Sequence, residues 1–453
     1  MRYLNLTNSK IIFALLFAFI SPTYSVFAQD SKISPIPIGG KSNRVSSLEK
    51  HRNNNAMKRL VLSNENLSAI PNDVFSLKNL EYLDLSNNKL TTLPAEIKNL
   101  TKLKEIKLNN NQFSKFPETL LTLSNVEIID LSSNNINALQ EDFSKFTSLE
   151  KINLSKNSIS GFINSFENLP NIVDIDISDN RITGFGFAFS SSRISSINIS
   201  NNRLSVISAD VGRLLNLRRL LIGNNRIQSL PREITNLNLL EIFDLKSNSV
   251  EKLPDDIHRL ESLNFLDISN NQIEDLPQSL KRMPQLSKLH ISHSKTRTVP
   301  KLVFELMQLT DLNLAGNHLS SIPTVLSNSR RLRELNLSNN NFKEIPVQIF
   351  GLSQLINLNL SNNFIQSINP QIQQLSTLNM LDLSNNNISE IPNEFANLTN
   401  CKIIILSNNK ITSLPSNLAN LINLRVFRLS QNPLTSNEKE KAKRLLPNVR
   451  FTF

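Results

Sequence analysis

Apolar residues recur along the chain in the pattern Leu80-x-x-Leu83-x-Leu85-x-x-Asn88, which returns every 23 residues except for one step of 22. The seventeen copies of the pattern begin at Met57, Leu80, Leu103, Val126, Leu149, Ile172, Ile194, Leu217, Leu240, Leu263, Leu286, Leu309, Leu332, Leu355, Leu378, Cys401 and Leu424. Side chains on a strand alternate between two faces, so the last two leucines of the pattern point to one side and their neighbours to the other. The pattern therefore predicts one short, half-buried strand in each unit.

The second half of each unit has apolar residues three or four positions apart, as in Leu90, Leu93, Ile97 and Leu100. This spacing is typical of a helical turn, and the proline that often follows the second leucine suits its start because proline has no backbone N–H. The asparagine after the strand, Asn88 and its equivalents, carries an amide that can bond backbone groups in the turn. Because one unit cannot bury its apolar side alone, stacked units are expected to share a continuous core and a parallel sheet.

This unit resembles the leucine-rich repeat. The resemblance implies an α/β solenoid, a leucine-rich repeat horseshoe of about 17 repeats with a concave parallel β-sheet and convex short helices or 3-10 turns. We expect a single array over residues 57–434, because each solenoid unit contacts only its neighbours. A C-terminal cap is expected at 435–453, with a charged helix over Asn437–Leu446, Ser436 as its N-cap, and a last strand after it.

The first 28 residues have the features of a secretory signal peptide. A polar, basic start precedes the apolar run Ile11–Ile20, and small residues stand at the cleavage-type positions before and at Ala28. Ten apolar residues are too few for a membrane anchor, and no later segment is apolar over enough length to cross a bilayer. We therefore expect 1–28 to be removed, 29–56 to form a leader and N-terminal cap, and the mature protein to be secreted, cell-surface or periplasmic.

Two parts of the chain resemble a bacterial family. The unit over Leu93–Leu108 and Leu253–Ile268 is similar to the 23-residue class shared by bacterial exported repeat proteins and intracellular Ras-suppressor-type proteins. The ending, from Asn432-Pro433-Leu434 to Phe453, resembles the C-terminal cap of the leptospiral repeat family. This resemblance covers essentially the whole chain, and it implies a secreted or surface protein that contacts host molecules.

The formal net charge of +11 is concentrated at the two ends of the chain. Residues 29–59 hold seven Lys or Arg against two acidic residues, and residues 438–453 hold five against two. Proteins that bind nucleic acid normally present a basic surface along the binding face, and the nearly neutral array between these ends has none. Nucleic acid is therefore excluded as the main partner, while a weak attraction of the ends to anionic lipid or glycan stays open.

Function is expected on the concave face, where side chains from every strand line up. One position of the motif is mostly Asp or Asn, which helps to keep an exposed sheet soluble. Two apolar groups stand out on this face. The first is Leu221, Ile242 and Phe265, bordered by Arg219, Asp244, Lys246 and Asp267, and the second is Met380, Ile403, Ile405 and Val426. Apolar anchors ringed by charge are typical of interface centres. The alternatives are scattered surface apolars for the first group and contact with the C-terminal cap for the second.

The fourth to seventh repeats are irregular. They lack the Leu-Pro pair, include the 22-residue step, and carry Gly161-Phe162 and the run Gly184–Ser192, so a local change of curvature is expected. An acidic cluster lies in the same region, formed by Asp130, Asp174, Asp176 and Asp179. This cluster suits a basic partner. Calcium is the less favoured alternative, because the spacing of the four residues matches no defined calcium loop, and no metal is predicted.

An enzyme is not expected from these residues. His290 and His293 share one repeat, but no carboxylate or cysteine stands beside them in a catalytic or metal-binding spacing. The chain has no Gly-rich phosphate loop, and no cofactor is predicted. Cys401 replaces a core leucine and is expected to be a small buried apolar residue.

Two functions remain. The first is a monomeric, exported, non-catalytic protein-binding module that uses its concave sheet, with a host cell-surface or matrix protein as the adhesion partner. The second is a periplasmic or envelope scaffold whose partner comes from the producing cell itself.

Overall fold

The computed structural model describes residues 57–163, 165–187, 189, 191–294 and 301–453. The predicted signal peptide (1–28) and the leader with its N-terminal cap (29–56) lie outside these residues, so both stay predictions. Among the described residues, no helix has the length and apolar character needed to cross a membrane.

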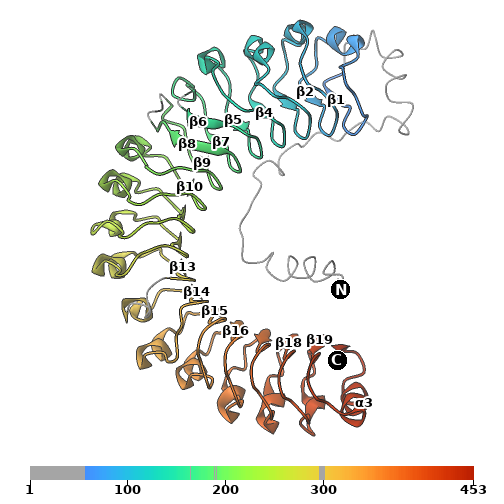
Figure 1. Ribbon diagram of the computed structural model, residues 1–453, viewed down its shortest axis with the longest axis vertical. Helices are drawn as coiled ribbons and strands as arrows, with labels where there is room; N and C mark the ends of the chain where they lie inside the picture. The colour runs from blue at the N-terminus through green and yellow to red at the C-terminus, as the bar shows by residue number, and fades with distance from the viewer. Residues whose placement is uncertain (1–56, 164, 188, 190, 295–300) are drawn as a thin grey trace, which may run out of the picture. The chain divides into compact units, whose positions relative to one another are not determined.

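One parallel sheet of eighteen strands runs through the array, as the repeat predicts (Figure 1). Its strands are β1 Arg59–Val61, β2 Tyr82–Asp84, β3 Glu105–Lys107, β4 Ile128–Asp130, β5 Lys151–Asn153, β7 Asp174–Asp176, β9 Ser196–Asn198, β10 Arg219–Leu221, β11 Ile242–Asp244, β12 Phe265–Asp267, β13 Lys288–His290, β14 Asp311–Asn313, β15 Glu334–Asn336, β16 Asn357–Asn359, β17 Met380–Asp382, β18 Ile403–Ile405, β19 Val426–Arg428 and β20 Arg450–Thr452. Each strand pairs with the next one in this series, and equivalent residues face each other, for example Tyr82 and Glu105. The sheet therefore presents straight rows of equivalent side chains on the inner side of the array.

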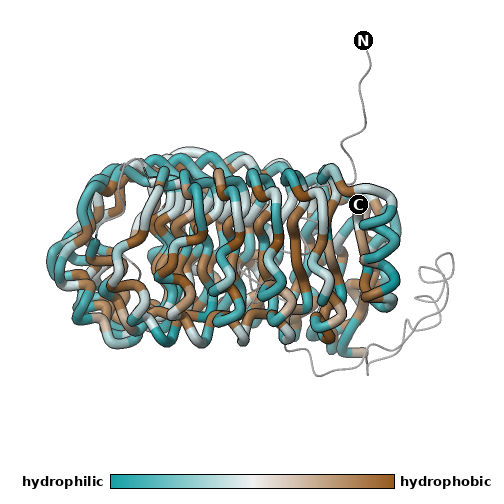
Figure 2. The backbone as a smooth tube through the Cα atoms, turned by 90° about the horizontal axis from the view of Figure 1, so that it is seen from below, coloured by the Kyte–Doolittle hydropathy of each residue, from teal (hydrophilic) through white to brown (hydrophobic). Residues whose placement is uncertain are grey.

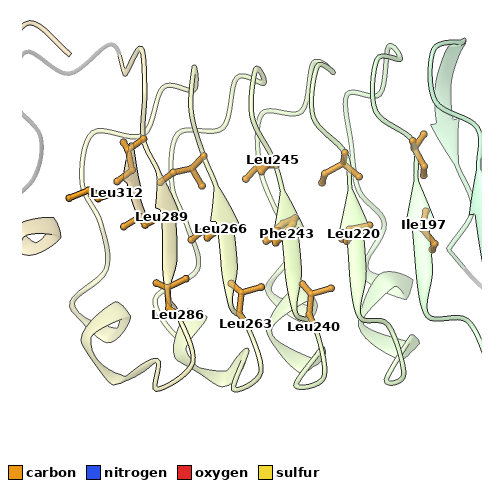
Figure 3. Close-up of a cluster of buried hydrophobic side chains, with 14 of the residues drawn as sticks. Ile197, Leu220, Leu240, Phe243, Leu245, Leu263, Leu266, Leu286, Leu289 and Leu312 are labelled. Carbon is orange, nitrogen blue, oxygen red and sulfur yellow. The ribbon is translucent and has the colours of Figure 1, made fainter. Parts of the chain in front are cut away.

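The middle residue of each strand points into the core, and the residues on either side of it point to the concave face. Leu83, Ile106 and Leu220 are all completely buried. Apolar positions recur from one turn of the chain to the next (Figure 2), and the buried side chains of successive strands form continuous rows (Figure 3). Burying one leucine contributes about 1.5–3 kcal/mol, and every unit adds several such residues.

The convex side is formed by short 3-10 helices, which confirms the expected return segments. They are η2 Asn72–Ser76, η3 Ala95–Asn99, η4 Glu118–Thr122, η5 Phe143–Lys145, η6 Ala209–Arg213, η7 Arg232–Asn236, η8 Ile257–Arg259, η9 Gln278–Arg282, η10 Lys301–Glu305, η11 Thr324–Asn328, η12 Val347–Gly351, η13 Pro370–Gln374, η14 Asn393–Asn397 and η15 Leu418–Asn420. Proline usually stands just before the first helical residue. Pro94, for instance, is extended, and its carbonyl accepts the N–H of Ile97 at 3.2 Å.

The asparagines that recur at the same position of each unit form a row of side-chain hydrogen bonds along the array, as expected for an amide in the turn. We call this row the asparagine ladder. The Nδ2 of Asn111 donates to the carbonyls of Leu85 and Leu108, both at 3.0 Å, while its Oδ1 accepts the N–H of Leu90 at 3.0 Å. The preceding residue, Asn110, has a positive φ of 57°, a backbone region that asparagine tolerates better than most residues. The ladder thus adds side-chain bonds to the backbone bonds between neighbouring turns, such as that from the N–H of Asn110 to the carbonyl of Ser132 at 2.8 Å.

The irregular repeats contain a second, two-stranded parallel sheet that the sequence did not predict. It pairs β6 (Ser160–Ile163) with β8 (Arg181–Phe185), in the segment that precedes the 3-10 helix in regular repeats, such as residues 89–94 before η3. Phenylalanine rings pack in series through these repeats, and this phenylalanine row consists of Phe116, Phe143, Phe146, Phe166, Phe185, Phe187 and Phe189. Most of these rings therefore occupy core positions equivalent to Leu93, Ile97 and Leu100 of a regular repeat.

The C-terminal cap consists of the helix α3 (Ser436–Leu445) and the strand β20. The prediction that Ser436 is the N-cap is wrong: Thr435 is the extended residue, and its Oγ1 accepts the N–H of Glu438 at 3.3 Å. The carboxylate of Glu438 also accepts the N–H of Leu414 at 2.8 Å, and Lys441 donates to the carbonyl of Leu414 at 2.8 Å. The cap therefore satisfies backbone groups that a further repeat would otherwise bond.

Candidate functional site

Two rows of side chains line the concave face. We call the first residues of the main-sheet strands the first row and the third residues the second row. In the first row, Arg219, Ile242 and Phe265 are direct neighbours on β10, β11 and β12. In the second row, Leu221 and Asp244 are neighbours on β10 and β11. The predicted apolar group and its charged border therefore lie on consecutive strands.

The Asp and Asn residues of the second row have a structural role besides solubility. Each uses a side-chain oxygen to accept the N–H two residues further on, as Asp130 does from Ser132 at 2.9 Å and Asn336 from Ser338 at 3.0 Å. Such bonds stabilise the turn that follows the strand. Leu221 cannot provide this bond, so the array gives up a recurrent turn interaction at the centre of the apolar group.

The residue two positions after the second row also departs from the repeat pattern beside Leu221. Serine occupies that position in most repeats, but repeats eight and nine carry Gly223 and Lys246. A Cβ atom at Gly223 would lie 2.8 Å from the Asp244 carboxylate and 3.1 Å from the Lys246 side chain. Lys246 pairs with Asp244 at 2.9 Å. The absence of a side chain at Gly223 thus makes room for this ion pair beside Leu221.

We call Leu221, Ile242 and Phe265, with Arg219, Asp244, Lys246 and Asp267, the central patch. Its three apolar residues were predicted to be exposed, but all three are half-buried by their neighbours on the sheet. Asp267 is 7% exposed. Burial raises the pKa of Asp244 above its ordinary value, although Lys246 opposes the shift. A partly buried apolar centre with charged edges is the arrangement of an interface core and its rim.

His290 adjoins the central patch, and the sequence interpretation missed its surroundings. It is 6% exposed, with Nδ1 3.7 Å from Asp267 Oδ2 and Nε2 3.4 Å from Asp311 Oδ1. The Nε2 contact lacks hydrogen-bond geometry, so it is an ion pair. Burial alone would lower the pKa of His290, but the two carboxylates raise it to about 9. Residues of neighbouring repeats therefore place two carboxylates beside this histidine, which the spacing within its own repeat does not predict.

The pKa of His290 gives the protein a pH-dependent stability. Because the folded-state pKa lies above the ordinary 6.5, the stabilisation is complete below pH 6.5 and is lost as the pH rises through about 9. Over this window we expect the free energy of unfolding to fall by up to about 3 kcal/mol relative to His290→Asn. Asparagine occupies the same row at Asn313, so the variant keeps the geometry of the strand. Urea unfolding followed by circular dichroism between pH 6 and 10 measures this difference, and parallel pH profiles of the two proteins would contradict it.

The second predicted apolar group exposes fewer side chains than the sequence indicates. Met380, Ile403 and Val426 are half-buried first-row neighbours on β17, β18 and β19. Ile405 is only 6% exposed, so its predicted exposure is wrong. Val426 pairs with Arg450 of the cap strand β20, which places one edge of the group against the C-terminal cap. The half-buried first-row residues therefore suit an interface centre, and the pairing of Val426 with β20 suits contact with the C-terminal cap.

The predicted acidic cluster is divided in the structure. Asp174 and Asp176 lie on β7, whereas Asp130 lies two strands away on β4, and Asp179 is exposed in the turn with a positive φ of 56°. Asp176 accepts bonds from Ser178 and from the side chain of Asn198. Burial raises the pKa of Asp130 and of Asp174 above their ordinary value. Within the described ranges, no three His, Cys, Asp or Glu side chains form a group that could hold a metal ion.

Cys401 is fully buried, which confirms its expected place in the core. Burial raises the pKa of its thiol to about 12, so the thiolate is not populated at neutral pH. Cys401 therefore acts as an apolar residue in the sixteenth repeat.

Models of three repeat families match the chain. The leucine-rich repeat region matches residues 187–314 and 244–345, the leucine-rich repeat matches 55–113, 330–388 and 353–411, and the BspA-type leucine-rich repeat region matches 116–234. The fold is a leucine-rich repeat solenoid. Leucine-rich repeat proteins generally serve as protein-binding scaffolds and are typically not enzymes, and no curated protein sequence matches this one.

Solved structures of leucine-rich repeat proteins show the same architecture. A leucine-rich repeat protein of Leptospira interrogans is 29% identical over 92% of this chain and 100% of its own, with a TM-score of 0.74. The ectodomain of the Arabidopsis thaliana receptor kinase GASSHO1/SCHENGEN3, solved with CASPARIAN STRIP INTEGRITY FACTOR 2, is 26% identical over 87% of this chain and 49% of its own, with a TM-score of 0.69. The functional domain of InlJ from Listeria monocytogenes is 18% identical over 78% of this chain and 74% of its own, with a TM-score of 0.62, and it supports the fold alone.

Proposed function

We propose that the chain is a non-catalytic, exported module that binds a protein partner at the central patch. The observation that carries this proposal is the coincidence of three local departures at repeats eight to ten. Leu221 interrupts the row of turn-forming Asp and Asn, Gly223 and Lys246 interrupt the row of serines, and Ile242 adjoins Phe265 in register. Single departures occur in other repeats, as at Lys107 and Ile405, but here they adjoin this apolar pair. A place where an array gives up regular interactions beside an apolar pair is expected to bind a ligand.

The proposed partner is a host cell-surface or matrix protein. The signal-peptide pattern of residues 1–28 supports export, and the likeness to the Leptospira interrogans protein supports a bacterial setting. The second candidate is a scaffold of the cell envelope that binds a partner of the producing cell, which the same signal peptide also supports. Protease treatment of intact producing cells, with a periplasmic protein as control, separates the two. Loss of the chain while the control survives favours the surface role, and survival of both favours the envelope role.

Substitution of the apolar residues tests the site itself. We expect Ile242→Asp with Phe265→Asp to weaken partner binding by at least about a hundredfold, because each buried anchor of an interface is worth roughly 1–2 kcal/mol or more. Both side chains are half-buried on the sheet surface and do not belong to the buried core. Binding is measured by biolayer interferometry against partners captured from host surface extracts and, separately, from envelopes of the producing cell.

Ile128→Asp is the matched control. Ile128 has the same position on β4 and is also half-buried, but it lies outside the central patch. The control is expected to bind as the wild-type protein does. Equal binding by the double variant and the wild type would refute the assignment of the central patch, provided that circular dichroism shows both to be folded.

A further inference from the structure

The first row has an ordered sequence of side chains across the central patch. Arg219, Ile242, Phe265 and Lys288 are successive neighbours on β10, β11, β12 and β13. Two cationic side chains therefore flank an apolar pair along one row of the sheet. With strands about 4.8 Å apart, the two cations are separated by three steps, or about 14 Å.

Both flanking cations are available to an external anion. Arg219 is half-buried, its Nε is enclosed without a hydrogen-bond partner, and the guanidinium makes no ion pair within the described residues. Its charge acts at longer range on Asp174 of β7, where it opposes the rise that burial causes in the pKa of that carboxyl. Lys288 is exposed and likewise forms no ion pair with any residue that the structure describes. Enclosing a charged donor without a partner costs free energy, which an incoming carboxylate would recover.

The carboxylates nearest to the apolar pair already have cationic partners within the array. Asp244 pairs with Lys246 at 2.9 Å, and Asp267 and Asp311 both face the charged imidazole of His290. With Arg219 and Lys288 included, four cationic groups stand against the three carboxylates, so the net charge around Ile242 and Phe265 is positive.

We infer that the central patch takes an extended peptide segment with one apolar side chain between two carboxylates placed four residues apart. An extended chain advances about 3.3 Å per residue, so four residues span about 13 Å and match the separation of Arg219 and Lys288. The apolar side chain then lies on Ile242 and Phe265. The inference rests on the proposed function, because it names the chemistry of the partner at the same site.

The neighbouring strands limit how far the acidic segment extends. Beyond Lys288 the first row continues with Asp311 and Glu334, two carboxylates on adjacent strands. Both carboxylate oxygens of Glu334 accept from the amide of Asn357 at 2.8 Å. The pKa of Glu334 is raised mainly by burial and further by the charge of Asp311. A further acidic residue of the partner would be repelled by these two carboxylates. The acidic residues of the bound segment are therefore expected to reach no further along the row than Lys288.

Selection from a random peptide library tests the inference. Twelve-residue peptides displayed on phage are selected on the full chain, and those that also bind the Ile242→Asp, Phe265→Asp chain are removed. We expect the remaining peptides to be enriched in two acidic residues four positions apart with an apolar residue midway.

A synthetic peptide with two glutamates four residues apart around a leucine is then measured by fluorescence anisotropy. Arg219→Gln and Lys288→Gln are each expected to weaken binding about fivefold, since charged groups at an interface rim contribute modestly. The same peptide with its glutamates two residues apart is expected to bind more weakly than the first. Lys151→Gln, a first-row change on β5 outside the patch, should alter binding less than twofold.

The outcomes separate this inference from the proposed function. Patch-dependent peptides with basic or uncharged flanks, or an affinity insensitive to Arg219→Gln and Lys288→Gln, overturn the acidic segment but leave the binding site in place. A library that yields no peptide dependent on Ile242 and Phe265, together with unchanged protein capture by the double variant, overturns both. Circular dichroism and gel filtration of each variant establish that it is folded.

Discussion

Asn271→Ala is expected to lower the free energy of unfolding by about 4 kcal/mol, since each lost bond costs roughly 1 kcal/mol and the groups left behind are buried. Asn271 is 3% exposed and belongs to the asparagine ladder. Its Nδ2 donates to the carbonyls of Leu245, Ile268 and Ser269 at 3.0, 3.1 and 3.2 Å, and its Oδ1 accepts the N–H of Val250 at 3.0 Å. Alanine leaves all four of these backbone groups without this partner.

Guanidinium unfolding and amide hydrogen exchange measure the effect of Asn271→Ala. The amide of Val250 should exchange faster in the variant, because it loses its acceptor. Asn238→Ala, in an exposed turn of the convex side, is the control and should change the unfolding free energy by less than about 0.5 kcal/mol. A loss below about 1 kcal/mol for Asn271→Ala would show that water or relaxed backbone replaces the ladder bonds.

Phe143→Ala is the second large change, with an expected loss of about 3–5 kcal/mol for a buried aromatic residue. Phe143 is 1% exposed, and its ring centroid lies 4.8 Å from Phe116, 5.7 Å from Phe146 and 5.5 Å from Phe166. Each aromatic pair adds about 0.5–1.5 kcal/mol to the value of the buried area. The substitution therefore opens a cavity and removes three ring contacts at once.

Phe143→Leu is the matched comparison for this position. Regular repeats carry Ile97 or Leu120 at the equivalent place, so leucine is compatible with the backbone. We expect Phe143→Leu to lose clearly less stability than Phe143→Ala, as measured by guanidinium unfolding. Equal losses for the two variants would mean that the ring contacts, and not the filled volume, stabilise the irregular repeats.

The architecture follows from the sequence because one signal is repeated seventeen times. The period places one strand in each unit, the alternation of apolar and polar residues determines which side of the strand is buried, and the recurring asparagine marks the turn after it. Features that occur only once in the chain were harder to predict. The helix cap fell on Thr435 and not on Ser436, since both residues can accept the bond and only the backbone conformation of Thr435 decides between them.

The surroundings of His290 show why a search within one repeat failed. Asp267 and Asp311 are remote from it in sequence and become neighbours only because equivalent residues of adjacent repeats pair in register. Writing the chain as rows of equivalent positions would have placed all three residues together. The pair β6 and β8 had no comparable signal, since the phenylalanines of the irregular repeats suit a strand or a helical turn equally well.

The constant register of the main sheet has a consequence for the gene. Because every unit meets its neighbours through the same positions, losing or duplicating one whole unit rejoins equivalent hydrogen bonds and equivalent core residues. Unequal crossing-over between such units lengthens or shortens the solenoid while preserving its fold. Each event moves the surface features on its two sides apart or together by about 4.8 Å, so binding surfaces on this scaffold diverge in discrete steps.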